Sequence, residues 1–158
     1  MAFAQALQET AIARWIGESG SLWGYPTILF LHTLGLATLA GLNTGINLRI
    51  LGIAPALPIS PMVRFFPIMW AAFAVAAISG TLLLIADATT KLAQVVFWVK
   101  LLLVALAVVN MQMIRSRVFS DPLVDQRALG SNARMLAITS TLLWVAATIA
   151  GRLIAYIY

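Results

Sequence analysis

Four long apolar segments dominate this sequence and leave few folds open to it. A helix of about 20 apolar residues crosses the roughly 30 Å of hydrocarbon in a bilayer, and each segment has about that length or slightly more. In lipid, all backbone polar groups must be satisfied within the protein, as they are in a helix. We therefore expect an all-α integral membrane four-helix bundle, a single membrane domain over residues 1–158. Its spans are expected at about 24–48, 66–86, 93–114 and 135–157.

Composition agrees with a membrane protein and excludes several classes of function. The chain is 62% hydrophobic and 9% charged, whereas a soluble domain has about 25% charged residues. It has no cysteine and one histidine, which excludes disulfides, zinc–thiolate sites, iron–sulfur clusters and a multi-histidine metal site within one chain. The formal net charge of +5 does not indicate nucleic-acid binding, because the basic residues lie beside the apolar segments.

The segments outside the expected spans are short. Apolar side chains recur at helical spacing over residues 3–18, which predicts one short helix lying in the membrane interface; a poorly ordered terminus is the alternative. This segment lacks the basic start and the continuous apolar core of a cleavable signal peptide. Three prolines in residues 50–61 predict an irregular first connection, and residues 87–91 predict a short turn with a solvated Asp87–Lys91 pair.

Lysine and arginine positions give the expected orientation. Cytoplasmic loops of membrane proteins carry an excess of these residues. The end of the bundle with the first and third connections would hold six of them, and the end with the termini would hold three. We therefore expect both termini on the periplasmic side of a bacterial inner membrane. The six are Arg49, Arg64, Arg115, Arg117, Arg127 and Arg134, and the three are Arg14, Lys91 and Arg152.

Three basic side chains fall at a common depth inside the expected spans. At 1.5 Å per residue, His32 lies about 13 Å, Lys100 about 10 Å and Arg152 about 9 Å from the same membrane face. Ionisable residues at membrane depth are costly and mark functional sites. Because gathered cations repel one another, we expect an anionic or metal-bearing partner between the helices.

Haem satisfies this expectation. The imidazole of His32 would ligate the iron, Lys100 would be a second axial ligand or a charge partner, and Arg152 would pair with a propionate. Gly35, one turn from His32, would leave a flat gap for the porphyrin. Each side chain also has a plainer interpretation: His32 as an interhelical hydrogen-bonding residue, and Lys100 and Arg152 as side chains that extend to the membrane surface.

The predicted function is that of a haem b protein in electron transfer with quinone or a partner redox subunit. If it is an enzyme, we expect a haem-dependent membrane oxidoreductase; a homo-oligomer would be required for bis-histidine ligation, since each chain has one histidine. Two alternatives stay open, a small transport or metal-handling protein and a non-catalytic subunit of a membrane complex. A copper site is disfavoured because the methionines lie toward the membrane face opposite His32: Met62, Met69, Met111, Met113 and Met135.

Several stretches of the sequence resemble known families. The stretches ESGSLWGYPTILFLHTLGLATLAG, INLRILG, VFWVKLLLVALAVVN and GRLIAY together resemble an uncharacterised bacterial family of small four-helix integral membrane proteins. More distantly, a histidine early in one span, a later glycine, an arginine at the end of that span and the stretch WVKLLLV resemble the HemJ-type protoporphyrinogen oxidases and the membrane domains of copper-resistance D proteins. The matching histidine and lysine form the haem pair in the HemJ-type enzymes, so this resemblance implies a haem pair of His32 and Lys100.

Overall fold

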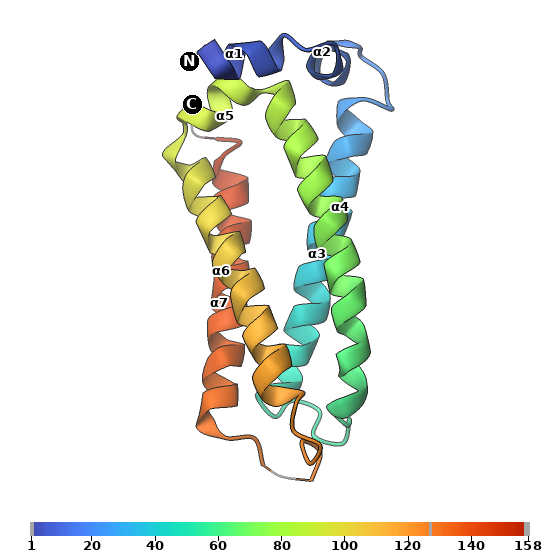
Figure 1. Ribbon diagram of the computed structural model, residues 1–158, viewed down its shortest axis with the longest axis vertical. Coiled ribbons are helices and arrows are strands. Elements are labelled where there is room, and N and C mark those ends of the chain that lie inside the picture. Colours follow the sequence, from blue (N-terminus) through green and yellow to red (C-terminus); the bar gives the residue numbers. More distant parts are fainter. Residues whose placement is uncertain (1, 127, 157–158) are drawn as a thin grey trace.

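The computed structural model describes residues 2–126 and 128–156, and the regular structure within them is entirely helical. Four helices are long and apolar enough to cross a membrane, which confirms the predicted all-α membrane bundle (Figure 1). They are α3 (Tyr25–Ile50), α4 (Phe65–Ala86), α6 (Val95–Val118) and α7 (Ser131–Leu153). Their outward faces expose many large apolar side chains, as lipid-facing helices do. The protein is a multi-pass membrane protein.

The ends of α3 and α4 lie within two residues of the predicted ones, whereas the end of α6 and the start of α7 differ by about one turn. Helix α6 continues past 114 to Val118, because Ile114 and Val118 are both buried in the core. Helix α7 begins at Ser131 rather than near 135, immediately after Gly130. The predicted end of the fourth span at 157 and the basic residue at 127 lie outside the described residues.

Two helices, not one, precede the bundle. Helix α1 (Ala2–Gln8) and helix α2 (Ala11–Glu18) are separated at Thr10, whose side-chain oxygen accepts a hydrogen bond of 3.3 Å from the backbone N–H of Ala13. A threonine in this position caps the start of a new helix, so a single helix over 3–18 was wrong. Both helices lie across the end of the bundle that holds the two termini (Figure 1).

Two short helices complete the fold. A 3₁₀ helix, η1 (Ser60–Arg64), precedes α4, and helix α5 (Ala88–Ala93) occupies the segment predicted as a turn. Helix α1 packs on α5, where the side-chain carbonyl of Gln8 accepts a 2.7 Å hydrogen bond from the Thr89 hydroxyl. Helix α2 packs on α4.

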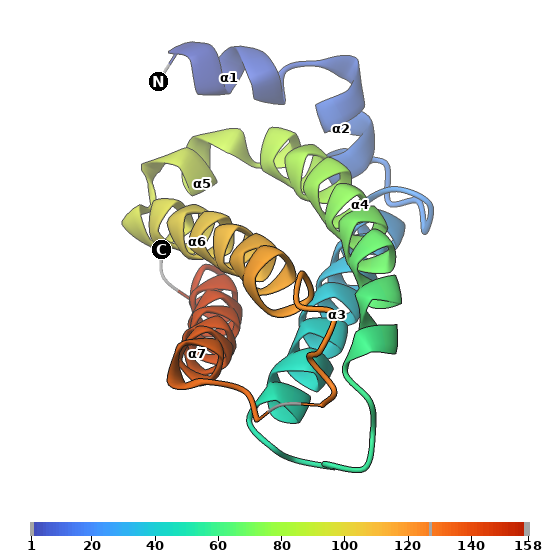
Figure 2. The same ribbon diagram turned by 60° about the horizontal axis from the view of Figure 1, so that its bottom comes forward.

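The four long helices pack as two pairs. Helix α3 packs along α4, helix α6 packs along α7, and the contact of α3 with α7 joins the pairs. Helices α4 and α6 approach each other less closely, and their side chains meet where the Arg115 guanidinium lies over the Phe66 ring. The two pairs lie close together at the end opposite the termini and diverge toward the termini (Figures 1 and 2). The bundle is therefore closed at one end and joined more loosely at the other.

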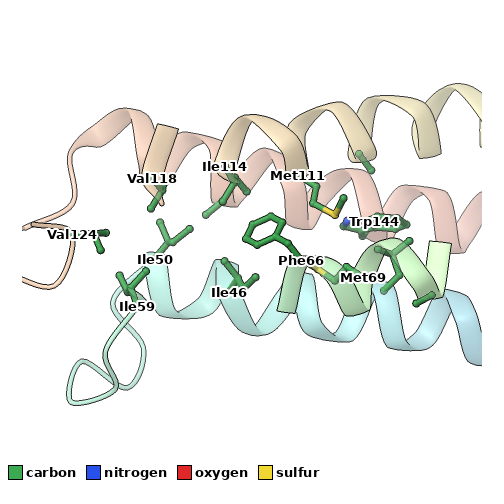
Figure 3. Close-up of a cluster of buried hydrophobic side chains, with 14 residues drawn as sticks. Ile46, Ile50, Ile59, Phe66, Met69, Met111, Ile114, Val118, Val124 and Trp144 are labelled. Atoms are coloured by element: carbon green, nitrogen blue, oxygen red, sulfur yellow. The ribbon is translucent and has the colours of Figure 1, made fainter. Parts of the chain in front are cut away.

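The main core fills the closed end. Its large buried side chains come from all four long helices and from both connections at that end (Figure 3). A smaller cluster of Ile16, Ile28 and Leu83 lies under α2 at the other end. His32 lies along α3 between these two clusters, because the smaller one includes Ile28 and the main one begins at Leu39.

Candidate functional site

The imidazole of His32 packs against the backbone of α4. Its Nδ1 atom lies 2.8 Å from the carbonyl oxygen of Ala76. A carbonyl oxygen can only accept, so Nδ1 carries the proton, and in the neutral ring Nε2 keeps a free lone pair. The Ser79 hydroxyl lies 3.4 Å from Nδ1 but donates its own proton to the Val75 carbonyl at 2.6 Å. The protein thus holds the ring in one orientation through Nδ1 and leaves Nε2 as the atom that can ligate a metal.

Gly80 makes this position of the ring possible. A Cβ atom at Gly80 would lie 2.8 Å from Cε1 and 3.1 Å from Nδ1 of His32. Real Cβ atoms do not come that close to a neighbour, so any other residue at Gly80 would displace the imidazole from α4. The sequence analysis missed this residue because a helical wheel does not tell which residue of α4 faces His32.

Lys100 occupies a similar position on the other helix pair. Its aliphatic chain lies over Gly151 of α7, where a Cβ atom would be 3.4 Å from Cε and 3.5 Å from Nζ of the lysine. The side chain is half-buried, and it has no hydrogen bond or ion pair within residues 2–126 and 128–156. Lys100 and His32 come from different helix pairs and lie near enough for their charges to interact.

Lys91 adds a positive charge that the sequence analysis assigned to a solvated turn. Its ammonium group donates a 2.7 Å hydrogen bond to the Leu83 carbonyl and lies 4.0 Å from a carboxylate oxygen of Asp87. Burial lowers the pKa of Lys91, and the Asp87 carboxylate partly offsets this effect. Lys91 also acts electrostatically on His32. The Asp87–Lys91 pair is therefore partly buried near His32.

The other two predicted site residues lie differently. Arg152 is exposed in the last turn of α7, directly after Gly151. Gly35 does not leave a gap, because a Cβ atom there would lie 2.8 Å from the Ala72 carbonyl oxygen and 3.0 Å from the Ala76 nitrogen. The backbone of α4 already fills the space that the sequence analysis reserved for a porphyrin. Gly35 serves the close contact of α3 with α4 instead.

The described residues offer few side chains that could ligate a metal. Within the described part of the chain, no group of three or more His, Cys, Asp or Glu side chains could hold a metal ion. A haem iron takes only one or two axial ligands from the protein, often a histidine, and its other ligands come from the porphyrin. Two cavities lie elsewhere, one of about 310 Å³ beside the α6–α7 connection and one of about 200 Å³ between α1 and α5.

No family model, curated protein or solved structure matches the chain, so the resemblances noted in the sequence stay predictions.

Proposed function

We propose that this protein binds one b-type haem between the α3/α4 pair and the α6/α7 pair and transfers electrons in the membrane. The hydrogen bond from Nδ1 of His32 to the Ala76 carbonyl carries this proposal. Histidines that ligate metals usually donate their other ring N–H to a carbonyl or carboxylate, which fixes the ring and directs the free nitrogen to the metal. Gly80 provides the space in which this ring is held.

The remaining cations suit the other parts of a haem. Lys100 offers an amine from the opposite helix pair, as a second axial ligand or as a charge partner. Lys91 and Arg152 lie nearer the end with the termini, where they would pair with the propionate groups. The haem propionates would thereby give these basic side chains negatively charged partners, which the nearby acidic side chains are too few to supply.

Access to the site would come from the lipid. The side chains of α4 and α6 pack together in the core at the closed end, whereas few backbone contacts join the two helices, so haem would enter between the two pairs nearer the termini. A haem supplies one-electron chemistry whose potential depends on its axial ligands and on exclusion of water. The chain would hold the iron through His32 and keep water away with apolar helices. Quinone or a redox subunit in the same membrane is the proposed partner, and the bacterial inner membrane is the proposed location.

Absorbance spectroscopy of the purified protein tests the proposal. Protein expressed with added haem precursor is expected to show a Soret band and reduced α and β bands, and His32→Ala is expected to lose them. Thr33→Ala is the matched control, because Thr33 is the exposed next residue of α3 and its hydroxyl bonds only to the Leu29 carbonyl. Arg152→Ala is expected to keep the band but to release haem faster to apomyoglobin.

Two results would contradict the proposal. One is a wild-type protein without a Soret band even after incubation with haem. The other is a His32→Ala variant that retains the wild-type spectrum, because the band would then come from haem held elsewhere.

A further inference from the structure

The larger of the two cavities lies at the closed end of the bundle, between the end of α6 and the start of α7. Its volume is about 310 Å³, at the lower end of the roughly 300–1,000 Å³ that is typical of ligand pockets. Arg117 in the last turn of α6 and Gly130, which directly precedes α7, both line it. The cavity is therefore at the level where two membrane spans end, which is the level of the lipid headgroups.

Two residues of opposite charge line this cavity, Arg117 and Asp121. They are four residues apart, yet within residues 2–126 and 128–156 they form no ion pair with each other or with any other side chain. The Asp121 carboxylate accepts one hydrogen bond, of 2.9 Å, from the Leu123 N–H through Oδ1. In that part of the chain, the Arg117 guanidinium and Oδ2 of Asp121 are thus left for a ligand.

The rest of the lining is largely apolar. It includes Val118, Val124, Leu129, Ala133 and Leu136. Close to Leu136 on α7, the side chains of Met135 and Ile138 are exposed, as lipid-facing side chains are. A ligand in this cavity would therefore have both a charged part, beside Arg117 and Asp121, and an apolar part that continues along α7.

We propose that this cavity binds the headgroup of one phosphatidylethanolamine molecule from the surrounding bilayer. The lipid phosphate would accept hydrogen bonds from Arg117, because a planar guanidinium matches the geometry of phosphate oxygens. The lipid ammonium would donate to the Asp121 carboxylate. The acyl chains would lie in the bilayer along the exposed face of α7.

The carboxylate distinguishes this lipid from the other common phospholipids. Basic pockets at the ends of spans generally bind anionic lipids, but phosphatidylglycerol would bring no cation to Asp121. Phosphatidylcholine has the same phosphate, but its quaternary ammonium has no N–H to donate to a carboxylate. The proposal does not depend on haem binding, because the cavity lies at the other end of α6 from Lys100.

Native mass spectrometry of the purified protein tests the proposal. The protein in detergent is titrated with phosphatidylethanolamine, phosphatidylcholine and phosphatidylglycerol that carry the same dioleoyl chains. We expect one phosphatidylethanolamine to bind with a dissociation constant about tenfold lower than either of the other two, since its headgroup satisfies both charged residues. Glycerophosphoethanolamine, which has the headgroup but no acyl chains, is expected not to displace it at equal concentration.

Two substitutions separate the roles of the charged residues. Arg117→Gln should weaken the binding of phosphatidylethanolamine about tenfold and also weaken that of phosphatidylcholine, because both have the phosphate. Asp121→Asn should weaken only phosphatidylethanolamine and should strengthen phosphatidylglycerol. Arg134→Gln is the matched control, because it removes an exposed arginine from the same end of the bundle that does not line the cavity.

Three results would overturn the proposal. The first is wild-type protein that binds phosphatidylglycerol or phosphatidylcholine as tightly as phosphatidylethanolamine. The second is an equal loss in Arg117→Gln and Arg134→Gln, because binding would then follow net charge rather than the cavity. The third is unchanged binding in folded Ala128→Trp, which would fill the cavity from an exposed position of its lining without removing a charge.

Discussion

Two glycines lie where α3 meets α4, and they lack side chains for different physical reasons. At Gly35 the nearest obstacle to a Cβ atom is the backbone of α4, at Ala72 and Ala76. At Gly80 the nearest obstacle is the imidazole of His32, which is the end of a side chain. A backbone in a packed helix cannot give way cheaply, whereas a side chain can rotate. The two positions should therefore respond differently to the same substitution.

Gly35→Ala is expected to destabilise the protein by about 1–3 kcal/mol, because the added methyl group must push two helices apart. Gly45→Ala is the control: nothing lies within 4 Å of its Cβ position, and replacing a glycine inside a helix stabilises by about 0.5–1 kcal/mol. Steric trapping or thermal unfolding in detergent measures both changes. Equal effects of the two substitutions would mean that Gly35 is not a contact point between α3 and α4.

Gly80→Ala is expected to act on the site rather than on the fold. The methyl group would displace the His32 ring from Ala76, so haem should be bound more weakly and with an altered Soret maximum. Stability should change less than in Gly35→Ala. A Gly80→Ala variant with a wild-type haem spectrum would show that the observed ring position is not the one that ligates iron.

For single residues, the sequence was informative about depth along a helix and uninformative about neighbours on other helices. Similar depths for His32 and Lys100 are predicted because the rise per residue along a helix is constant. Gly35 was misassigned, and Gly80 and Lys91 were missed, because their roles depend on which residue of another helix lies opposite. The spacing of residues along one helix does not show how that helix is aligned with its neighbours.

The connections at the closed end show how elements are fixed to each other. The Asp125 carboxylate in the α6–α7 connection accepts hydrogen bonds from the backbone N–H groups of Ile59 and Ser60 in the α3–α4 connection. Arg49 at the end of α3 donates to the carbonyl oxygens of Leu57 and Pro55 within the latter connection. The proline-rich segment is therefore irregular, as predicted, yet it is held on both sides.

Acid should weaken the hydrogen bonds that Asp125 makes between the two connections. Interaction with the Ser60 side chain and the hydrogen bond from the Ile59 N–H lower the pKa of Asp125 below its ordinary value of 3.8. A lowered folded-state pKa means that the stabilisation is complete above pH 3.8 and is lost as the pH falls through the folded pKa. The melting temperature of the wild-type protein should exceed that of Asp125→Asn near pH 6. The difference should shrink below about pH 4.

A comparison variant separates this effect from general acid sensitivity. Asp121→Asn removes a carboxylate that, among the described residues, bonds only locally, to the Leu123 N–H, so it should show a smaller difference at pH 6. A gap between wild type and Asp125→Asn that stays constant down to pH 3 would contradict the assignment.

Helices could be predicted from the sequence more readily than their interruptions. The four spans follow from length and apolar composition, which lipid enforces. The break at Thr10 depends on a local hydrogen bond, the Thr10 cap, and the short helix α5 is held by the hydrogen bond from Thr89 to Gln8 of another helix. Such bonds compete with continued helix by small energies, so periodicity alone does not locate them.

At the scale of the whole molecule, the two ends of the bundle differ in their number of basic residues. Among the described residues, Arg49, Arg64, Arg115, Arg117 and Arg134 lie at the closed end, while Arg14, Lys91 and Arg152 lie at the end with the termini. The positive-inside rule then predicts that the closed end faces the cytoplasm.

Single cysteines can test this orientation, because the natural chain has none. In intact cells an impermeant maleimide is expected to label Ser21→Cys, which lies between α2 and α3, and not Ser120→Cys, which follows α6. Ser120→Cys should react only after the membrane is permeabilised. The reverse pattern would invert the proposed topology and would place the His32 layer on the cytoplasmic side.

The sparse contact between α4 and α6 has a mechanical consequence. The α3/α4 pair and the α6/α7 pair are joined by the contact of α3 with α7 and by the main core at the closed end. A small rotation about that end would be amplified along the helices, so the separation of His32 and Lys100 would change more than any distance within the core. Rigid packing at the closed end would thus determine the separation of the two helix pairs at the end with the termini.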